Sequence, residues 1–246
     1  EQSSGDVGVF SRISWQNLLV MVVMALVVCA LGNSDRTFHF RMRMEECMVK
    51  GNFAEATQVG VKEAATDSSL TMLRVWALSE NHMLGDRLFS YPLVGGSDAM
   101  LPNGASVKLM MADERKLYAH LGVVFIQKMR PRVYLETLHK AHRATAAAHD
   151  WLLCAYLLDR DLNQFVRHLA KYYPINEQLP KHYKEALIIY KHTTSHPLIS
   201  YYNNVKEADY DDFQDLGDKY GNKRERYTAL RDKYGDTYWF YYHYKR

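Results

Sequence analysis

The hydrophobic and polar positions follow a helical period along nearly the whole chain. Apolar residues recur three and four positions apart, which places them on one face of a helix. Strand-like alternation stays short outside the aromatic C-terminal tail. We therefore expect an all-α fold. The periodic segments are 38–50, 54–65, 70–80, 133–148, 151–158, 162–173 and 181–192.

One segment has no polar positions at all. Leu18 to Leu31 forms a run of 14 residues without a charge, Gly or Pro. With its flanks it approaches the ~20 residues that cross a bilayer, and Trp15 suits a membrane interface. We expect a transmembrane helix over 13–32, after an N-terminal flank over 1–12. A buried core helix is one alternative. A signal peptide is the other alternative. The segment before the run is only weakly basic and no cleavage pattern follows it, which argues against a signal peptide.

Two stretches carry the turn and packing residues of tetratricopeptide (TPR) hairpins. Gly51–Ala56 resembles the turn between two such helices, and a comparable turn at His82 follows 31 residues later. Tyr118-x-x-Leu121-Gly122-x-x-Phe125 fits the aromatic and Leu-Gly pattern of a first helix over 114–128. We therefore expect TPR-like hairpins over 36–128.

The second half of the chain predicts a further hairpin segment over 133–246, closed by an aromatic C-terminal cap. Together the two parts would form an antiparallel helical array, an α-solenoid. Pro131 interrupts the expected hairpin near 129–132. Either the chain turns an irregular corner there, or the sequence lacks a segment of a longer hairpin.

Composition narrows the function only a little. The net charge of +3 is spread over mixed acidic and basic positions, so we expect no nucleic-acid partner. Cys29, Cys47 and Cys154 form neither a disulfide framework nor a metal-ligand spacing. No catalytic triad or nucleotide-binding loop stands out. We expect no catalytic residue, metal or cofactor in this chain.

Two weak signals have structural explanations. His139 and His142 share a helix face, but a metal site needs three or four converging ligands, so we expect them to face solvent. Gly95-Gly96-Ser97 lacks the Gly-Lys-Ser/Thr that completes a phosphate loop, so we expect an ordinary connection.

Three places offer candidate binding residues. An aspartate–arginine pair could recognise a polar group, and the start of a helix after Pro180 could meet an anion. The aromatic tail could dock a partner, although we expect it to fold back on the last helices. The candidates are Asp86, Arg87, Lys181, His182, Tyr183, Trp239 and Tyr241.

A resemblance to a known family rests on four phrases. They are Gly51-Asn52-Phe53, Leu84–Pro92, Leu179–Leu187 and Arg231–Tyr242. In these the chain resembles, over 15–246, the C-terminal half of an uncharacterised multi-pass membrane-protein family of Bacteroidetes-type bacteria, known as a domain of unknown function. The resemblance implies further membrane spans before this chain and a helical domain outside the cytoplasm. It implies no catalytic residue.

The resulting hypothesis is a membrane-anchored helical-repeat scaffold, without catalytic activity of its own, that binds a protein partner at the bacterial inner membrane. One alternative is the accessory domain of a multi-pass glycosyltransferase-like enzyme. Another is a structural component of a cell-envelope assembly.

Overall fold

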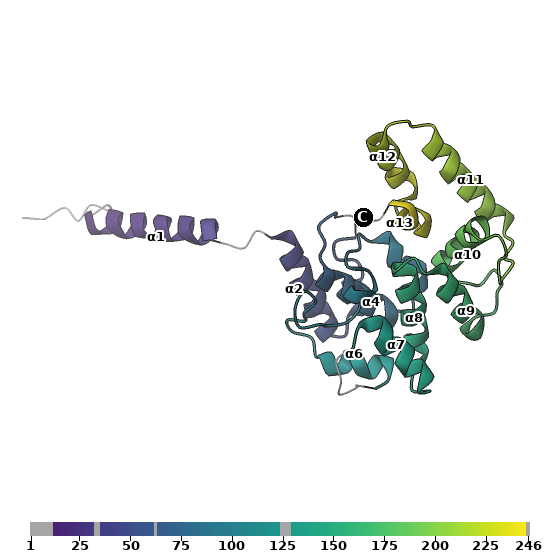
Figure 1. Ribbon diagram of the computed structural model, residues 1–246. Helices are drawn as coiled ribbons and strands as arrows, with labels where there is room; N and C mark the ends of the chain where they lie inside the picture. The colour runs from purple at the N-terminus through teal and green to yellow at the C-terminus, as the bar shows by residue number, and fades with distance from the viewer. Residues whose placement is uncertain (1–11, 32–34, 62, 124–128, 245–246) are drawn as a thin grey trace, which may run out of the picture. The chain divides into compact units, whose positions relative to one another are not determined.

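The computed structural model describes residues 12–31, 35–61, 63–123 and 129–244, and every regular element in these ranges is a helix. The all-α prediction is therefore confirmed for this part of the chain. Two units are distinguished, 1–36 and 37–246. The elements, labelled in Figure 1, are α1 (Arg12–Leu31), α2 (Arg36–Val49), α3 (Phe53–Ala56), α4 (Ser68–Glu80), α5 (Leu84–Arg87), η1 (Leu88–Ser90), η2 (Gly96–Ala99), α6 (Glu114–Leu121), α7 (Pro131–Lys140), α8 (Ala146–Leu158), α9 (Leu162–Tyr172), α10 (Lys181–Thr193), α11 (Asn204–Asp218), α12 (Lys223–Tyr234) and α13 (Tyr238–Tyr244).

The first unit contains α1, which covers most of the expected membrane span. Within the described ranges no helix has the length and apolarity needed to cross a bilayer, so the transmembrane helix predicted over 13–32 is not found. The large apolar side chains from Trp15 to Val28 that the structure describes on α1 are exposed.

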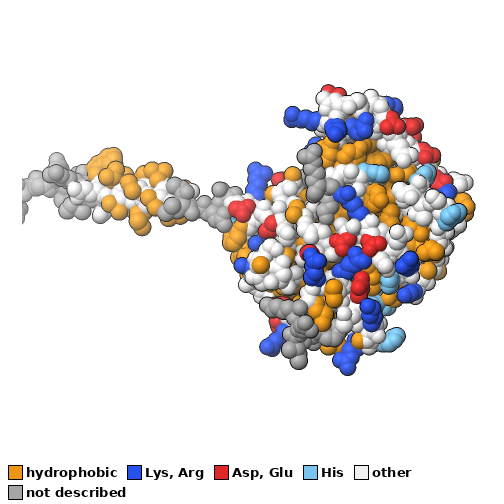
Figure 2. All heavy atoms as spheres, viewed as in Figure 1, with side chains coloured by type: hydrophobic (Ala, Val, Ile, Leu, Met, Phe, Trp, Pro, Cys, Tyr) orange, Lys and Arg blue, Asp and Glu red, His pale blue; other side chains and the backbone are white. Residues whose placement is uncertain are grey.

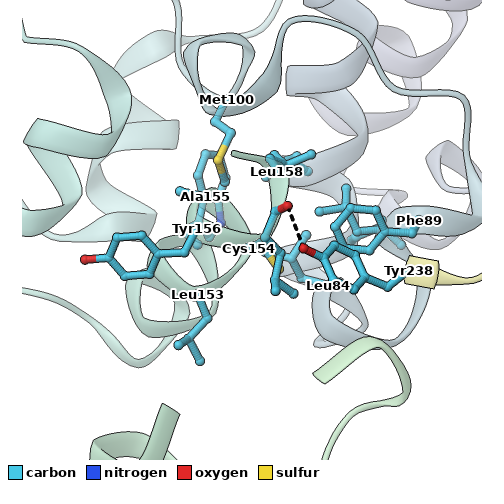
Figure 3. Packing of buried hydrophobic residues seen from close by; sticks show 14 of the residues in the cluster. Leu84, Phe89, Met100, Leu153, Cys154, Ala155, Tyr156, Leu158 and Tyr238 are labelled. Atoms are coloured by element: carbon cyan, nitrogen blue, oxygen red, sulfur yellow. Dashed lines mark hydrogen bonds between the residues drawn. The ribbon is translucent and has the colours of Figure 1, made fainter. Parts of the chain in front are cut away.

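Two helices lie at the centre of the second unit and are buried on all sides. On α4 every residue from Ser69 to Ser79 is buried, and on α8 every residue from Trp151 to Leu158 is buried. Such helices need neighbours around their whole circumference. α8 contacts α4, α5, α6, α7, α9 and η2. In the close-up of its packing, Tyr156 points away from Phe89 and Tyr238 (Figure 3).

The helices around this centre each bury one face. On α9 the residues Leu162, Phe165, Val166 and Leu169 are buried at the three- and four-residue spacing of an amphipathic helix. Asp161 caps its N-terminus by accepting a hydrogen bond from the backbone N–H of Gln164. The predicted period of this segment is therefore confirmed.

Four helices end in the same turn, with one residue in the left-handed conformation. After α2, α4, α7 and α8 the N–H of the second residue beyond the cap bonds back to the third-last residue of the helix, as in a Schellman motif. The left-handed residues are Gly51, His82, His142 and Arg160, with φ of 76°, 55°, 53° and 59°. The turns at Gly51 and His82, which the sequence suggested were comparable, therefore have the same backbone conformation, although only the first has glycine at the left-handed position.

The helix expected over 114–128 ends earlier. α6 stops at Leu121 because Gly122 has a φ of 143°, outside the helical region. A Cβ on Gly122 would lie 2.3 Å from the carbonyl oxygen of Arg143. The glycine does permit close approach, but to the turn between α7 and α8 rather than to a partner helix. Phe125 lies outside the described residues, and the predicted α-solenoid and the nature of the 129–132 junction stay predictions.

Long loops are held by buried or half-buried carboxylates. Glu45 on α2 is fully buried and accepts hydrogen bonds from the backbone N–H groups of Met110, Met111 and Ala112. Asp159, after α8, accepts bonds from both the N–H and the hydroxyl of Ser97. The glycine-rich segment at 95–97 is thus the connection that its sequence predicts, since a carboxylate of the protein occupies its donors.

Candidate binding site

A concave surface of the second unit lies across α7, α8 and α9. We name it the α7–α9 groove, and its volume is about 840 Å³. Figure 2 shows the face of the molecule on which α7 and α8 lie in Figure 1, with Lys, Arg and His side chains interspersed with acidic ones. The groove is lined by Arg132, Glu136, His139, Lys140, His142, Ala144, His149, Leu152, Tyr156, Gln164, His168, Lys171 and Tyr172.

Local sequence determines which side chains reach the groove. Pro131 begins α7 at a position where a missing N–H costs nothing, and Leu135 and Leu138 turn its apolar face inward. The other face of α7 then carries Arg132, Glu136 and His139. The turn at His142 reverses the chain so that α8 returns alongside.

Two histidines use the same hydrogen bond to fix their rings. His139 Nδ1 lies 2.7 Å from the carbonyl oxygen of Leu135, and His168 Nδ1 lies 2.9 Å from that of Gln164. A carbonyl only accepts, so Nδ1 carries the proton in both rings. Nε2 is therefore the nitrogen that can take up a second proton. In His139 this atom is buried and has no hydrogen-bond partner among the described residues.

A third histidine lies beside His139 in an aromatic stack. The rings of His149 and Tyr172 are parallel to within 12°, with centroids 4.1 Å apart, and His139 lies 5.2 Å from His149. Burial lowers the pKa of His149, against the charge of Asp150. Burial also lowers the pKa of His139, and the positive charges of His149, His168 and Lys171 lower it further. Both rings are therefore held toward the neutral form.

Arg132 is already occupied by carboxylates of the protein. Its guanidinium bonds to Glu136 at 3.1 Å and Asp161 at 2.8 Å, and lies 3.6 Å from Asp159. It also lies over the ring of Tyr156. Burial opposes its charge, but the hydrogen bonds to Asp161 and Glu136 outweigh burial and raise its pKa. Arg132 therefore connects α7 with the start of α9 and leaves little of its charge for a ligand.

Lys140 and Lys171 differ from Arg132 because their ammonium groups are not paired with carboxylates of the described fold. Both are exposed, and neither forms an ion pair with any residue in the described ranges. Arg132 is balanced by Glu136, Asp159 and Asp161, so the unpaired positive charge of the lining is that of the two lysines. The groove is thus a basic surface whose charge increases when its histidines protonate.

The residues predicted from sequence come together elsewhere, at a buried cluster around the start of α10. We name this the α10 junction: Asp86, Phe89, Lys181, His182, Tyr183, Glu185, Tyr238, Trp239 and Tyr241. Asp86 accepts a hydrogen bond from the backbone N–H of Lys181 at 2.7 Å, which caps α10. The Lys181 ammonium bonds to Asp236.

His182 and Glu185 are both fully buried in the junction. His182 Nδ1 lies 2.9 Å from Glu185 Oε2, which also accepts the backbone N–H of Tyr238 at 2.7 Å. His182 Nε2 accepts the N–H of Phe89, so its proton lies on Nδ1. These bonds join three segments that are far apart in sequence.

The aromatic candidates are turned into the same core. The indole of Trp239 donates to the Glu185 carbonyl, and the Tyr241 hydroxyl donates to Leu158. Tyr183 is fully buried and donates to Asp150 at 2.8 Å. Arg87 is the exception, since it is half-buried on α5, where its charge counteracts the burial that raises the pKa of Tyr91. The junction holds the fold together, and ligand binding by these residues stays a prediction.

The groove could be recognised only in part from sequence. His139 and His142 attract attention as a pair, but the residues that complete the surface, His149 and His168, lie on other helices. Within the described ranges no three His, Cys, Asp or Glu side chains lie close enough together to hold a metal ion.

Fold and site define a class: an all-helical protein with a basic, histidine-lined groove across three consecutive helices. Residues 112–245, which include the groove and most of the α10 junction, match the family described as "Family of unknown function (DUF6057)", and the chain belongs to this family. The predicted resemblance to a family of unknown function is thereby confirmed. Its bacterial source, multi-pass membrane region and TPR repeats stay predictions. No curated protein and no solved structure matches the chain.

Proposed function

We propose that this protein is a non-catalytic interaction module that binds a segment of a partner protein in the α7–α9 groove. The observation that carries the proposal is the contrast between groove and core. Buried charges such as Glu45 and Glu185 are bonded within the fold, Glu185 through one of its two oxygens, whereas the exposed Lys140 and Lys171 line the groove and form no ion pair within the described ranges.

The chemistry of the lining supports binding rather than catalysis. The described lining of the groove contains no serine, threonine or cysteine that the histidines could activate. Cys154 is fully buried on the other side of α8, and burial raises the pKa of its thiol. A reactive cysteine needs the opposite shift.

The proposal includes attachment of the module to a membrane through α1. Its large apolar side chains are exposed in the described structure, and a helix that is apolar on all sides requires an apolar environment. Flotation of the full chain with liposomes tests this. Leu19→Lys together with Met24→Lys should abolish co-flotation, and retention by the doubly charged variant would contradict attachment through α1.

The groove itself is tested by site-specific photo-crosslinking of the full-length protein in its native cells. A crosslinking residue in place of Lys140 should yield one reproducible protein adduct. The same residue in place of Lys219, which is exposed on another helix boundary, should not. Equal adducts at both positions, or none at Lys140, would contradict the proposed function.

A further inference from the structure

The groove combines exposed lysines with histidines, two of which hold their Nδ1 proton on a backbone carbonyl. We propose that its ligand is an acidic peptide segment of a partner protein, bound through separate carboxylates, and that binding strengthens as the pH falls. This inference rests on the proposed function and names the chemistry of the partner.

The donors are dispersed over three helices. Lys140 belongs to α7, His149 to α8, and His168 and Lys171 to α9. A compact phosphate is bound best by a guanidinium fork or converging N–H groups. Here the single guanidinium, Arg132, is already shared among Glu136, Asp159 and Asp161. The remaining single-nitrogen donors match carboxylates on successive side chains of a peptide.

Protonation of the histidines is coupled to this binding. The charged and titratable groups around them are Arg132, Glu136 and Lys140 on α7, His142 in the turn, Tyr156 on α8, Lys171 and Tyr172 on α9, and Asp159 and Asp161, which pair with Arg132. Asp150 lies beside His149 and raises its pKa, but its own carboxylate accepts bonds from Tyr173 and Tyr183 and is directed to them. Burial lowers the pKa of His139 and His149, and at His139 the positive charges of His149, His168 and Lys171 act in the same direction.

A bound carboxylate reverses that balance. It accepts an N–H from a protonated ring and lies near Lys140 or Lys171, so the histidine pKa rises when the ligand binds. Binding then takes up protons, and the affinity increases as the pH falls from the bound-state pKa toward the lower free-state pKa. Below the free-state pKa the rings are protonated without ligand and the gain stops. Peptide glutamates remain charged in this range, since their ordinary pKa is about 4.3.

The test is a fluorescence-anisotropy titration of the full chain with a labelled ten-residue peptide of alternating Glu and Gly. Because each proton taken up changes Kd by about tenfold per pH unit, we expect binding at least ~10-fold tighter at about pH 5.5 than at about pH 7.5. Lys140→Glu with Lys171→Glu should abolish binding at both pH values. His149→Gln with His168→Gln should bind with a reduced pH dependence.

Matched controls separate groove chemistry from general charge. Lys219→Glu and His196→Gln change exposed residues outside the groove lining and should leave both affinity and pH dependence unchanged. Circular dichroism of each variant checks that the helices are intact. A peptide of alternating Lys and Gly should not bind, and inorganic phosphate at the same charge concentration should not compete.

The outcomes also separate this inference from the proposed function. If photo-crosslinking from Lys140 captures a partner but the Glu peptide does not bind, or binds with no change between the two pH values, the inference is overturned and the interaction module remains. Competition by inorganic phosphate overturns the peptide chemistry. If crosslinking fails as well, the proposed function fails with it.

Discussion

The α10 junction and the α7–α9 groove are both polar clusters built around histidines, yet they differ in what surrounds the charges. In the junction, His182 and Glu185 are fully buried and bond to each other and to the backbone of η1 and α13. In the groove, His139 and His149 are only partly buried, and Lys140 and Lys171 are exposed. Buried polar groups bonded to the protein stabilise a fold, whereas open ones with unused donors are available to a ligand.

The largest effect should follow from removing the centre of the junction. Glu185→Ala leaves the His182 Nδ1–H and the Tyr238 N–H buried without an acceptor, so the free energy of unfolding should fall by about 3–5 kcal/mol. Urea unfolding measures the change. Glu207→Ala, which breaks the partly exposed pair with Lys191, should cost less than about 1 kcal/mol. Similar losses in the two variants would show that the junction does not hold the fold.

A smaller effect is expected beside the junction, where Tyr183 donates to the half-buried Asp150. Tyr183→Phe should lower the free energy of unfolding by about 1.5–3 kcal/mol near neutral pH, as expected for a bond to a charged group. Tyr227→Phe, which changes a more exposed tyrosine on α12, is the matched control and should have little effect.

The pH dependence of this effect has a definite sign. Burial already raises the pKa of Asp150 above 3.8, and its bonds from Tyr173 and Tyr183 counteract the increase. A raised carboxyl pKa contributes stability below the ordinary value that is lost as the pH rises through the folded-state value. Without the Tyr183 hydroxyl the pKa rises further, so this loss should extend to higher pH in Tyr183→Phe. Parallel stability–pH curves for variant and wild type would contradict this.

The two equivalent turns at Gly51 and His82 predict opposite effects of about 1 kcal/mol. Gly51→Ala places a Cβ at positive φ, with no atom within 4 Å, so the variant should lose ~1 kcal/mol through backbone strain alone. His82→Gly removes the same strain and should gain up to about 1 kcal/mol. Urea unfolding of both variants measures the pair, and changes of the same sign would show that the turns are not equivalent.

These turns show what the sequence could and could not predict. The helical period identifies α4, α8, α9 and α10 because their apolar spacing is decided locally. The end of α6 at Gly122 is not predictable in that way, because it depends on the close approach of the Arg143 carbonyl.

For the groove, too, the sequence predicts local features but not the contacts between helices. The period predicts a helix at His139, but it continues that helix to 148, past the turn at His142 that separates α7 from α8. It also does not predict that His168 belongs to the same surface. That surface exists only after α7, α8 and α9 pack together. The sequence drew attention to His182 and Trp239 because they are chemically unusual for a helix start and a chain end. The structure shows that both are used in packing.

The smallest expected change in stability belongs to the groove, since substitutions of exposed residues outside tight packing change the free energy of unfolding by less than about 0.5 kcal/mol. The most direct test of our account is therefore the pair Lys140→Glu and Lys171→Glu in one chain, titrated with the Glu peptide at about pH 5.5 and unfolded in urea. We predict that peptide binding is lost while the free energy of unfolding stays within about 0.5 kcal/mol of wild type. Unchanged binding, or loss of binding together with unfolding, would contradict a groove whose cations serve a ligand rather than the fold.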